Sequence, residues 1–159
     1  MTEATFCYDF GSPNAYLAHR VILGIAARTG ATFRYVPVLL GGLFKLANNR
    51  APMIAFADIP AKTTYMRREM ARFVRRHGLS AFAMNPHFPV NTLMLMRGAV
   101  AAERLGLVEI YIEAMMRGMW EQGLKLDDPA ILAAALTEAG LRLDRYLTDD
   151  QAWLRAVPA

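Results

Sequence analysis

The residues best suited to chemistry lie in the stretch "GSPNA", residues 11–15, where a strand-like run gives way to a helix-like run. Gly11 permits a sharp turn, and Pro13 suits a first helical turn, where its missing N–H is not needed. Ser12 therefore falls at the helix N-cap, where free backbone N–H groups and the positive end of the helix dipole meet. Either Ser12 only caps the helix, or the same field also stabilises an external anion such as a thiolate.

The flanking sequence predicts the elements that position this turn. Residues 4–10 and 32–38 alternate and are rich in aromatic and β-branched side chains, which is typical of strands. Residues 13–28 between them carry an apolar helical face, and Gly30 follows as a helix stop. Together they predict a β-α-β unit with parallel strands and a right-handed crossover.

The chain after this unit is predicted to be helical. Residues 39–52 indicate a loop or a broken short helix, because they contain several Gly and Asn residues. A helix is expected from Pro60 to Arg76 or His77, before Gly78, with Asp58 as its cap. Its apolar stripe is Met66, Met70, Phe73 and Val74. Further helices are expected at about 92–105, at about 107–122 and from Asp127 or Asp128 to Gly140, with short helical turns within 143–154.

Composition narrows the classes of function. The chain has 159 residues with a net charge of +4, and no apolar run reaches the roughly 18 residues of a membrane span. With no signal-peptide pattern at the start, we expect a cytoplasmic protein. One cysteine, Cys7, excludes an intramolecular disulfide and a cysteine metal cluster, and we expect it to be a small buried residue. The three histidines lack ligand spacing, so no metal site is predicted.

Two residue clusters have both a structural and a functional interpretation. Six basic residues and one acid lie between Lys62 and Arg76. They form either a solvated helix face or a surface that attracts an anion, and the absence of interleaved aromatic residues argues against nucleic acid.

The methionines gather in residues 84–119, as adaptable core or as the lining of an apolar pocket for an aromatic molecule. The candidates for such a lining are Met94, Met115, Met116 and Met119.

Four stretches occur in the order of a known family: "DFGSPNAYLAHRV", "RYVPVLLGGLFKLANNRAP", "IPAKTTYMRREMARF" and "NPHFPVNTL". They resemble the 2-hydroxychromene-2-carboxylate isomerases, which are thioredoxin-like proteins close to the kappa-class glutathione transferases and the DsbA-like disulfide oxidoreductases. The redox pair Cys-x-x-Cys of the wider fold corresponds here to Ser12-Pro13-Asn14-Ala15. Dithiol chemistry at this position is therefore impossible.

The resemblance implies an α/β fold, a thioredoxin-like β-α-β unit with a large all-helical insertion. Residues 1–40 would form the N-terminal half of the thioredoxin-like domain and residues 41–159 the helical domain. Family members continue into a proline loop, two antiparallel strands and a last helix, and no such segment is recognisable in this sequence. We therefore expect the usual C-terminal strand pair and last helix to be absent from this chain, which would leave the first strand with an open edge.

The resemblance also implies an activity, that of a glutathione-dependent isomerase acting on an aromatic ring-fission carboxylate in aromatic hydrocarbon catabolism. Glutathione is the expected cofactor, and its thiolate would sit beside the catalytic Ser12. The expected partners are the small aromatic carboxylate and glutathione, with no nucleic acid and no membrane, in a homodimer. A kappa-like glutathione transferase and an inactive or truncated binding module are the alternatives.

The remaining site residues are also carried over from the resemblance. The candidates for glutathione or substrate binding are Asn14, Lys45, Lys62, Tyr65, Phe88 and Asn91. Lys45 matches a lysine near the substrate, where a cation would suit the carboxylate, and otherwise is an exposed lysine. Tyr65 lines the cleft or belongs to the core. Asn91 contacts a ligand or caps the following helix.

Overall fold

The computed structural model describes residues 2–141 and shows the predicted β-α-β unit. The strands β1 (Glu3–Tyr8) and β2 (Thr32–Pro37) pair in parallel, with Phe6 opposite Tyr35, and α1 (Pro13–Thr29) connects them. In the described part of the chain the sheet consists of these two strands. The helical turns predicted within 143–154 lie outside the described residues.

Local signals set both ends of α1 as the sequence predicts. Ser12 is the N-cap in an extended conformation, and Pro13 occupies the first turn. Gly30 ends the helix with a φ of 68°, and its N–H donates to the carbonyl oxygen of Ala26. This left-handed conformation favours glycine because it has no Cβ.

Six helices follow in the described residues. They are α2 (Leu40–Leu46), α3 (Pro52–Ala55), α4 (Pro60–His77), α5 (Leu93–Arg104), α6 (Val108–Trp120) and α7 (Pro129–Glu138). Of the two predicted caps for α7, Asp127 and Asp128, the structure shows Asp128, whose side chain accepts from the N–H groups of Ala130 and Ile131. The prediction for Asp58 is wrong, because Ile59 occupies the N-cap of α4 and no side chain caps that end.

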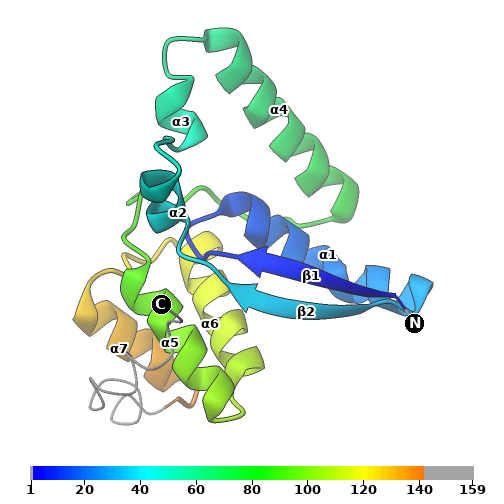
Figure 1. Ribbon diagram of the computed structural model, residues 1–159, viewed down its shortest axis with the longest axis vertical. Helices are drawn as coiled ribbons and strands as arrows, with labels where there is room; N and C mark the ends of the chain where they lie inside the picture. Colours follow the sequence, from blue (N-terminus) through cyan, green and yellow to red (C-terminus); the bar gives the residue numbers. More distant parts are fainter. Residues whose placement is uncertain (1, 142–159) are drawn as a thin grey trace.

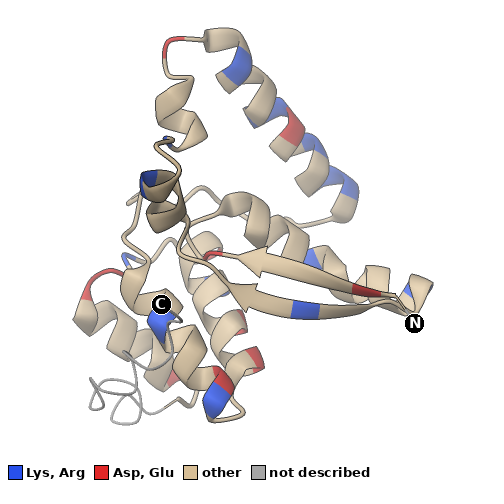
Figure 2. Cartoon of the chain, viewed as in Figure 1, with Lys and Arg blue, Asp and Glu red and all other residues tan. Residues whose placement is uncertain are grey.

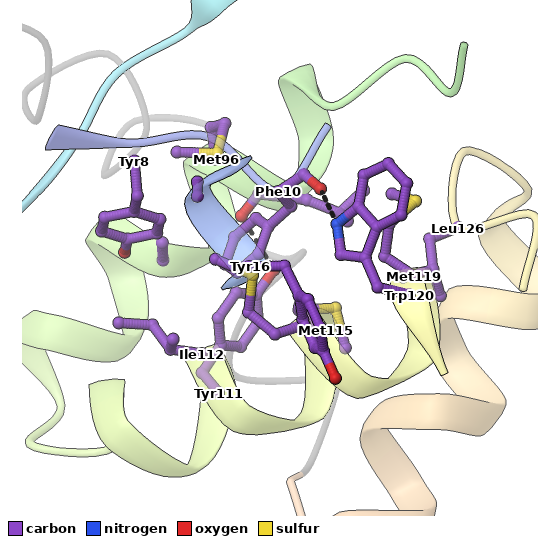
Figure 3. Close-up of a cluster of buried hydrophobic side chains, with 14 of the residues drawn as sticks. Tyr8, Phe10, Tyr16, Met96, Tyr111, Ile112, Met115, Met119, Trp120 and Leu126 are labelled. Atoms are coloured by element: carbon purple, nitrogen blue, oxygen red, sulfur yellow. Dashed lines mark hydrogen bonds between the residues drawn. The ribbon is translucent and has the colours of Figure 1, made fainter. Parts of the chain in front are cut away.

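The core lies where β1, α1, α5, α6 and α7 meet, and Figure 3 shows its centre. Trp120 is fully buried, and its indole Nε1–H donates to the carbonyl oxygen of Phe10 at 2.8 Å, just beyond β1. Met115, Met116 and Met119 are fully buried in the same cluster. These three methionines are therefore core residues, and the alternative that they line an open pocket is wrong.

The helices α2, α3 and α4 form an arm, residues 40–77, that projects from the rest of the molecule (Figure 1). None of their residues is buried. Only the second half of α4 meets the core, through half-buried Met70, Phe73 and Val74. The apolar stripe predicted for α4 therefore exists, but it is only partly covered.

The position of Cys7 corrects the sequence-based expectation, because this cysteine is exposed. Side chains alternate along β1, so Phe6 and Tyr8 face the core while Thr5 and Cys7 face the opposite side. That side also carries exposed Arg34 of β2, which donates to Thr5. The face is therefore polar and open to solvent.

Candidate functional site

The Ser12 turn, residues 10–13, presents the N-terminus of α1. The Ser12 Oγ accepts a hydrogen bond from the N–H of Ala15 at 3.2 Å, and the residue is half-buried. A serine hydroxyl has one donor hydrogen besides its acceptor lone pairs. Within residues 2–141 no acceptor takes the Ser12 hydroxyl hydrogen. Capping therefore uses a lone pair and leaves the O–H free to donate, so the two interpretations of Ser12 are compatible.

The backbone around Ser12 adds a second donor. Pro13 has no N–H, the N–H of Ala15 is taken by Ser12, and the N–H of Tyr16 donates to the Ser12 carbonyl oxygen at 3.2 Å. The N–H of Asn14 has no acceptor in the described part of the chain, as expected for the first turn of a helix. The O–H of Ser12 and the N–H of Asn14 are thus donors at the positive end of the helix dipole. This combination suits an anion.

Asp9 and Thr92 hold the Ser12 turn from inside. The buried Asp9 carboxylate accepts from the N–H of Gly11 at 2.8 Å and from the N–H of Leu40, the first residue of α2, at 2.7 Å. Thr92, also buried, lies against Gly11, where an added Cβ would come within 3.1 Å of its Cγ2. The sequence analysis included neither residue among the candidate site residues. The signal for Asp9 was a carboxylate near the end of the strand predicted at 4–10, directly before Gly11 and Ser12.

A polar network fixes α1 against α6. The Nη1 of Arg20 donates to both carboxylate oxygens of Glu113, at 2.8 and 3.0 Å, and its Nη2 donates to Glu121 at 2.5 Å. The hydroxyl of Tyr16 also donates to Glu121. Burial raises the pKa of the Glu113 carboxyl, but the hydrogen bond and charge of Arg20 outweigh it, so this pKa lies below its usual range. The network lies one and two turns beyond Ser12, and thereby sets the direction of the α1 axis.

This network was also missed from the sequence. Tyr16 and Arg20 are four residues apart, as are Glu113, Arg117 and Glu121 on the second predicted helix. Such spacing places each set on one helix face. The pairing of the two faces depends on how the helices pack, which the sequence alone does not specify.

Four of the six predicted binding residues lie on segments that meet the Ser12 turn or the core beside it: Asn14, Lys45, Phe88 and Asn91. Lys45 is exposed in the last turn of α2, the helix whose first N–H binds Asp9. Phe88 is half-buried, precedes a cis peptide bond to Pro89, and its ring centroid lies 6.0 Å from that of Trp120.

Asn91 is exposed one residue before Thr92. Its Oδ1 accepts from the N–H of Leu93 at 3.0 Å, at the start of α5. This contact is that of a local Asx turn. The N-cap of α5 is Thr92, and no side chain caps that end, so the expectation that Asn91 caps the helix is wrong. Asn14 lies in the first turn of α1 with an exposed side chain, directly beside Ser12.

Lys62 and Tyr65 are not brought to the Ser12 turn. They lie in the first turns of α4, at the far end of the arm (Figure 1). The Lys62 ammonium sits 3.7 Å from the ring centroid of Phe56, a cation–π contact. Tyr65 is 63% exposed and is neither a core residue nor part of a cleft around Ser12.

The open depression on α4 is separate from the Ser12 turn. It has a volume of about 520 Å³ and is lined by residues of α4 alone, Pro60, Ala61, Thr64, Tyr65, Arg68 and Arg72. Figure 2 shows basic residues spaced along this helix. All six basic side chains between Lys62 and Arg76 are exposed, which matches the solvated-face interpretation. We therefore keep the candidate site at the Ser12 turn.

Across residues 2–141, no group of three or more His, Cys, Asp or Glu side chains is arranged to hold a metal ion. No helix in the same range has the length and apolar character needed to cross a membrane.

A parallel β-α-β unit with an N-capping serine at the start of its helix, followed by a helical region, defines a thioredoxin-like protein. The chain belongs to the family of DSBA-like thioredoxin domains, whose profile matches residues 4–152. Curated proteins give no significant sequence match.

Two solved structures share the fold. A 2-hydroxychromene-2-carboxylate isomerase (HCCA isomerase) is 20% identical, with a TM-score of 0.72, and the match covers 97% of this chain and 74% of that one. A putative protein disulfide isomerase from Nitrosomonas europaea is 15% identical with a TM-score of 0.61, and the match covers 97% and 73% of the two chains. At these identities the likeness is one of fold.

Proposed function

We propose that this protein is a glutathione-dependent isomerase of the 2-hydroxychromene-2-carboxylate type, with the glutathione thiolate held at Ser12. The observation that carries the proposal is the free O–H of Ser12 beside the free N–H of Asn14, at a half-exposed helix N-terminus. The family and the shared fold with an HCCA isomerase support it. The chain has no Cys-x-x-Cys pair, so the disulfide chemistry suggested by the second neighbour has no dithiol here.

The residues at the turn fit a thiolate better than a thiol. Two free donors and the positive end of α1 stabilise negative charge, which lowers the pKa of a thiol placed there. Bound glutathione would supply a reusable nucleophile near neutral pH. Ser12 would orient the sulfur and hold its charge through its O–H, because capping uses one acceptor lone pair and leaves the hydrogen free to donate. Lys45, exposed at the end of α2, would attract the substrate carboxylate.

Turnover with a limiting amount of glutathione tests this function. The 2-hydroxychromene-2-carboxylate equilibrium is followed by absorbance, while reduced glutathione is measured before and after. Many turnovers per glutathione with a constant pool support the isomerase. A pool that falls in step with product would instead identify a transferase. No heat in calorimetry with millimolar glutathione would leave a binding module and refute both enzymes.

Ser12→Ala separates the two uses of the serine. We expect turnover to fall at least about tenfold, because the thiolate loses a donor, while the free energy of unfolding falls by only about 1 kcal/mol, as for a lost cap. Stopped-flow assays and urea denaturation measure the two effects. The matched control is Asp128→Ala, which removes the cap of α7. It should lower the free energy of unfolding by a similar amount and leave turnover unchanged. Equal turnover in the two variants would show that Ser12 acts only as a helix cap.

Lys45→Ala tests the substrate-binding part. We expect KM for the carboxylate substrate to rise about threefold to tenfold, as for the loss of one partly solvated charge contact, with little change in kcat. The matched control is Arg50→Ala, which removes another exposed cation a few residues beyond α2. A KM that rises equally in both variants would indicate general electrostatic attraction and remove Lys45 from the site.

A further inference from the structure

Asp9 is an unusual residue within the described part of the chain. It is 3% exposed, yet it forms no ion pair with any described basic side chain. An ionised carboxylate in such a position is costly unless other polar groups replace water. Here two backbone N–H groups do so, at 2.8 Å from Gly11 and 2.7 Å from Leu40, distances typical of charge-assisted hydrogen bonds.

The two donors come from segments that are remote in sequence. Gly11 precedes Ser12 in the turn, whereas Leu40 begins α2, the short helix that ends near Lys45. The backbone of Asp9 belongs to the same arrangement, since its carbonyl oxygen accepts from the N–H of Ser12 at 3.0 Å. One residue therefore touches the Ser12 turn twice and the start of α2 once.

The packing leaves little freedom around this contact. A Cβ at Gly11 would lie 3.1 Å from the Cγ2 of Thr92 and 3.4 Å from the Asp9 Oδ1. The turn is thus confined between the loop that ends at Thr92 and the Asp9 carboxylate. By contrast, α2 buries none of its own residues and needs an external anchor.

We propose that Asp9 is a positioning residue, whose carboxylate locks the Ser12 turn to the first turn of α2 and so holds Ser12 and Lys45 in one arrangement. The inference rests on the proposed function for its catalytic consequence, but the lock itself is a property of the free protein. A neutral amide cannot reproduce it, because the side chain of asparagine offers one oxygen where two N–H groups need acceptors.

Amide hydrogen exchange of the free protein tests the lock without any ligand. In Asp9→Asn we expect exchange at Leu40, Gly11 or both to accelerate at least about tenfold, with the increase spreading along α2. The matched control is Asp128→Asn, an aspartate whose two backbone N–H donors at a helix start bind the same oxygen, Oδ1, which asparagine retains. It should leave amide exchange in α7 and at Leu40 unchanged. Unaltered exchange at both Gly11 and Leu40 in Asp9→Asn would overturn the proposal.

Gly11→Ala provides a second variant in case Asp9→Asn does not fold. It retains the carboxylate but pushes the turn against Thr92 and Asp9. If Asp9 transmits this strain, exchange at Leu40 accelerates although residue 40 is far along the chain. Protection at Leu40 equal to that of the wild type would contradict the lock.

A double-mutant cycle in the enzymatic assay tests the consequence for the site. Lys45→Ala should raise KM about threefold or more in the wild type but less than about 1.5-fold in Asp9→Asn, because α2 no longer holds Lys45 in place. Equal effects in both backgrounds would show that Asp9 does not position Lys45. If the wild type binds no glutathione, the proposed function fails, while the exchange at Leu40 still decides whether the lock exists.

Discussion

The arm and the body of the molecule, the body being β1, α1, β2 and α5–α7, both contain many apolar residues but differ in how they use them. The body buries Trp120, Tyr111 and its central methionines completely. The arm buries nothing within its helices, and Leu46 is 86% exposed. Of the eleven large exposed hydrophobic residues among those described, six lie between Leu43 and Tyr65. Hydrophobic content alone therefore does not determine burial, because burial also needs a facing element.

The candidate site lies where these two regions meet. Ser12 begins α1 of the body, and Leu40 begins α2 of the arm, with the Asp9 carboxylate between them. On the body side the turn is fixed by Thr92 and by the anchoring of α1 to α6. On the arm side, the hydrogen bond to Asp9 is the contact that ties the first turn of α2 to the Ser12 turn. We therefore expect the free energy of unfolding to depend mainly on the body, and conformational change on ligand binding to occur mainly in the arm.

The sharpest contrast in stability should come from truncating one apolar residue in each region. Trp120→Ala removes a fully buried ring and its hydrogen bond to Phe10, and should lower the free energy of unfolding by about 3–5 kcal/mol. Ile54→Ala in the arm removes a side chain that is 62% exposed and should change it by less than about 0.5 kcal/mol. Urea denaturation measures both. A similar loss for Ile54 would mean that the arm is covered in solution.

Two glycine substitutions should change the free energy of unfolding by smaller amounts and in opposite directions. At Gly98 in α5 an added Cβ would lie 2.0 Å from the Tyr111 Oη, so Gly98→Ala should cost about 1–3 kcal/mol by overpacking. At Gly41 in α2 no atom lies within 4 Å of an added Cβ. Gly41→Ala should instead stabilise by about 0.5–1 kcal/mol, because alanine favours the helix. Thermal denaturation of the two variants checks the signs, and a destabilised Gly41→Ala would indicate a hidden contact in the arm.

The smallest expected effect is a pH dependence in the body. Burial and the charge of Arg20 hold the pKa of the His19 imidazole below its ordinary value of 6.5, despite the nearby Glu113. His19 also contacts the hydroxyl of Tyr35 through Nδ1 at 2.9 Å. Because the unfolded chain binds the proton more readily, this contribution to stability is present above pH 6.5 and is lost as pH falls below it. The pKa of Glu113 is also lowered, from 4.5, so its contribution is lost below pH 4.5.

Urea denaturation between pH 8 and pH 3 measures this dependence. We expect stability to decline on acidification in two steps, and His19→Gln to abolish the upper one. The control is His87→Gln, which changes an exposed histidine in a loop. Stability that rises on acidification through pH 6.5 would show that His19 is protonated in the folded protein.

The site was predictable only in part. Contacts between residues close in the sequence could be predicted, whereas contacts between residues far apart in the sequence could not. Ser12 at the start of α1 could be placed from Gly11 and Pro13 alone, since caps depend on a few neighbouring residues. Lys62 and Tyr65 were assigned to the same cleft by resemblance, but they lie on the arm away from it. Asp9 and Thr92 were missed because their partners are 31 and 81 residues away in the sequence, respectively.

By itself the sequence determined the local structure: the parallel β-α-β unit, the cap at Ser12, the glycine stops at Gly30 and Gly78, and the capped start of α7 at Asp128. Each depends on backbone preferences and hydrogen bonds within a few residues. Only the tertiary structure decided which apolar faces are covered, that Cys7 faces solvent, and that a buried carboxylate joins α2 to the Ser12 turn. Those features depend on which elements lie opposite one another, and nearest-neighbour chemistry does not contain that information.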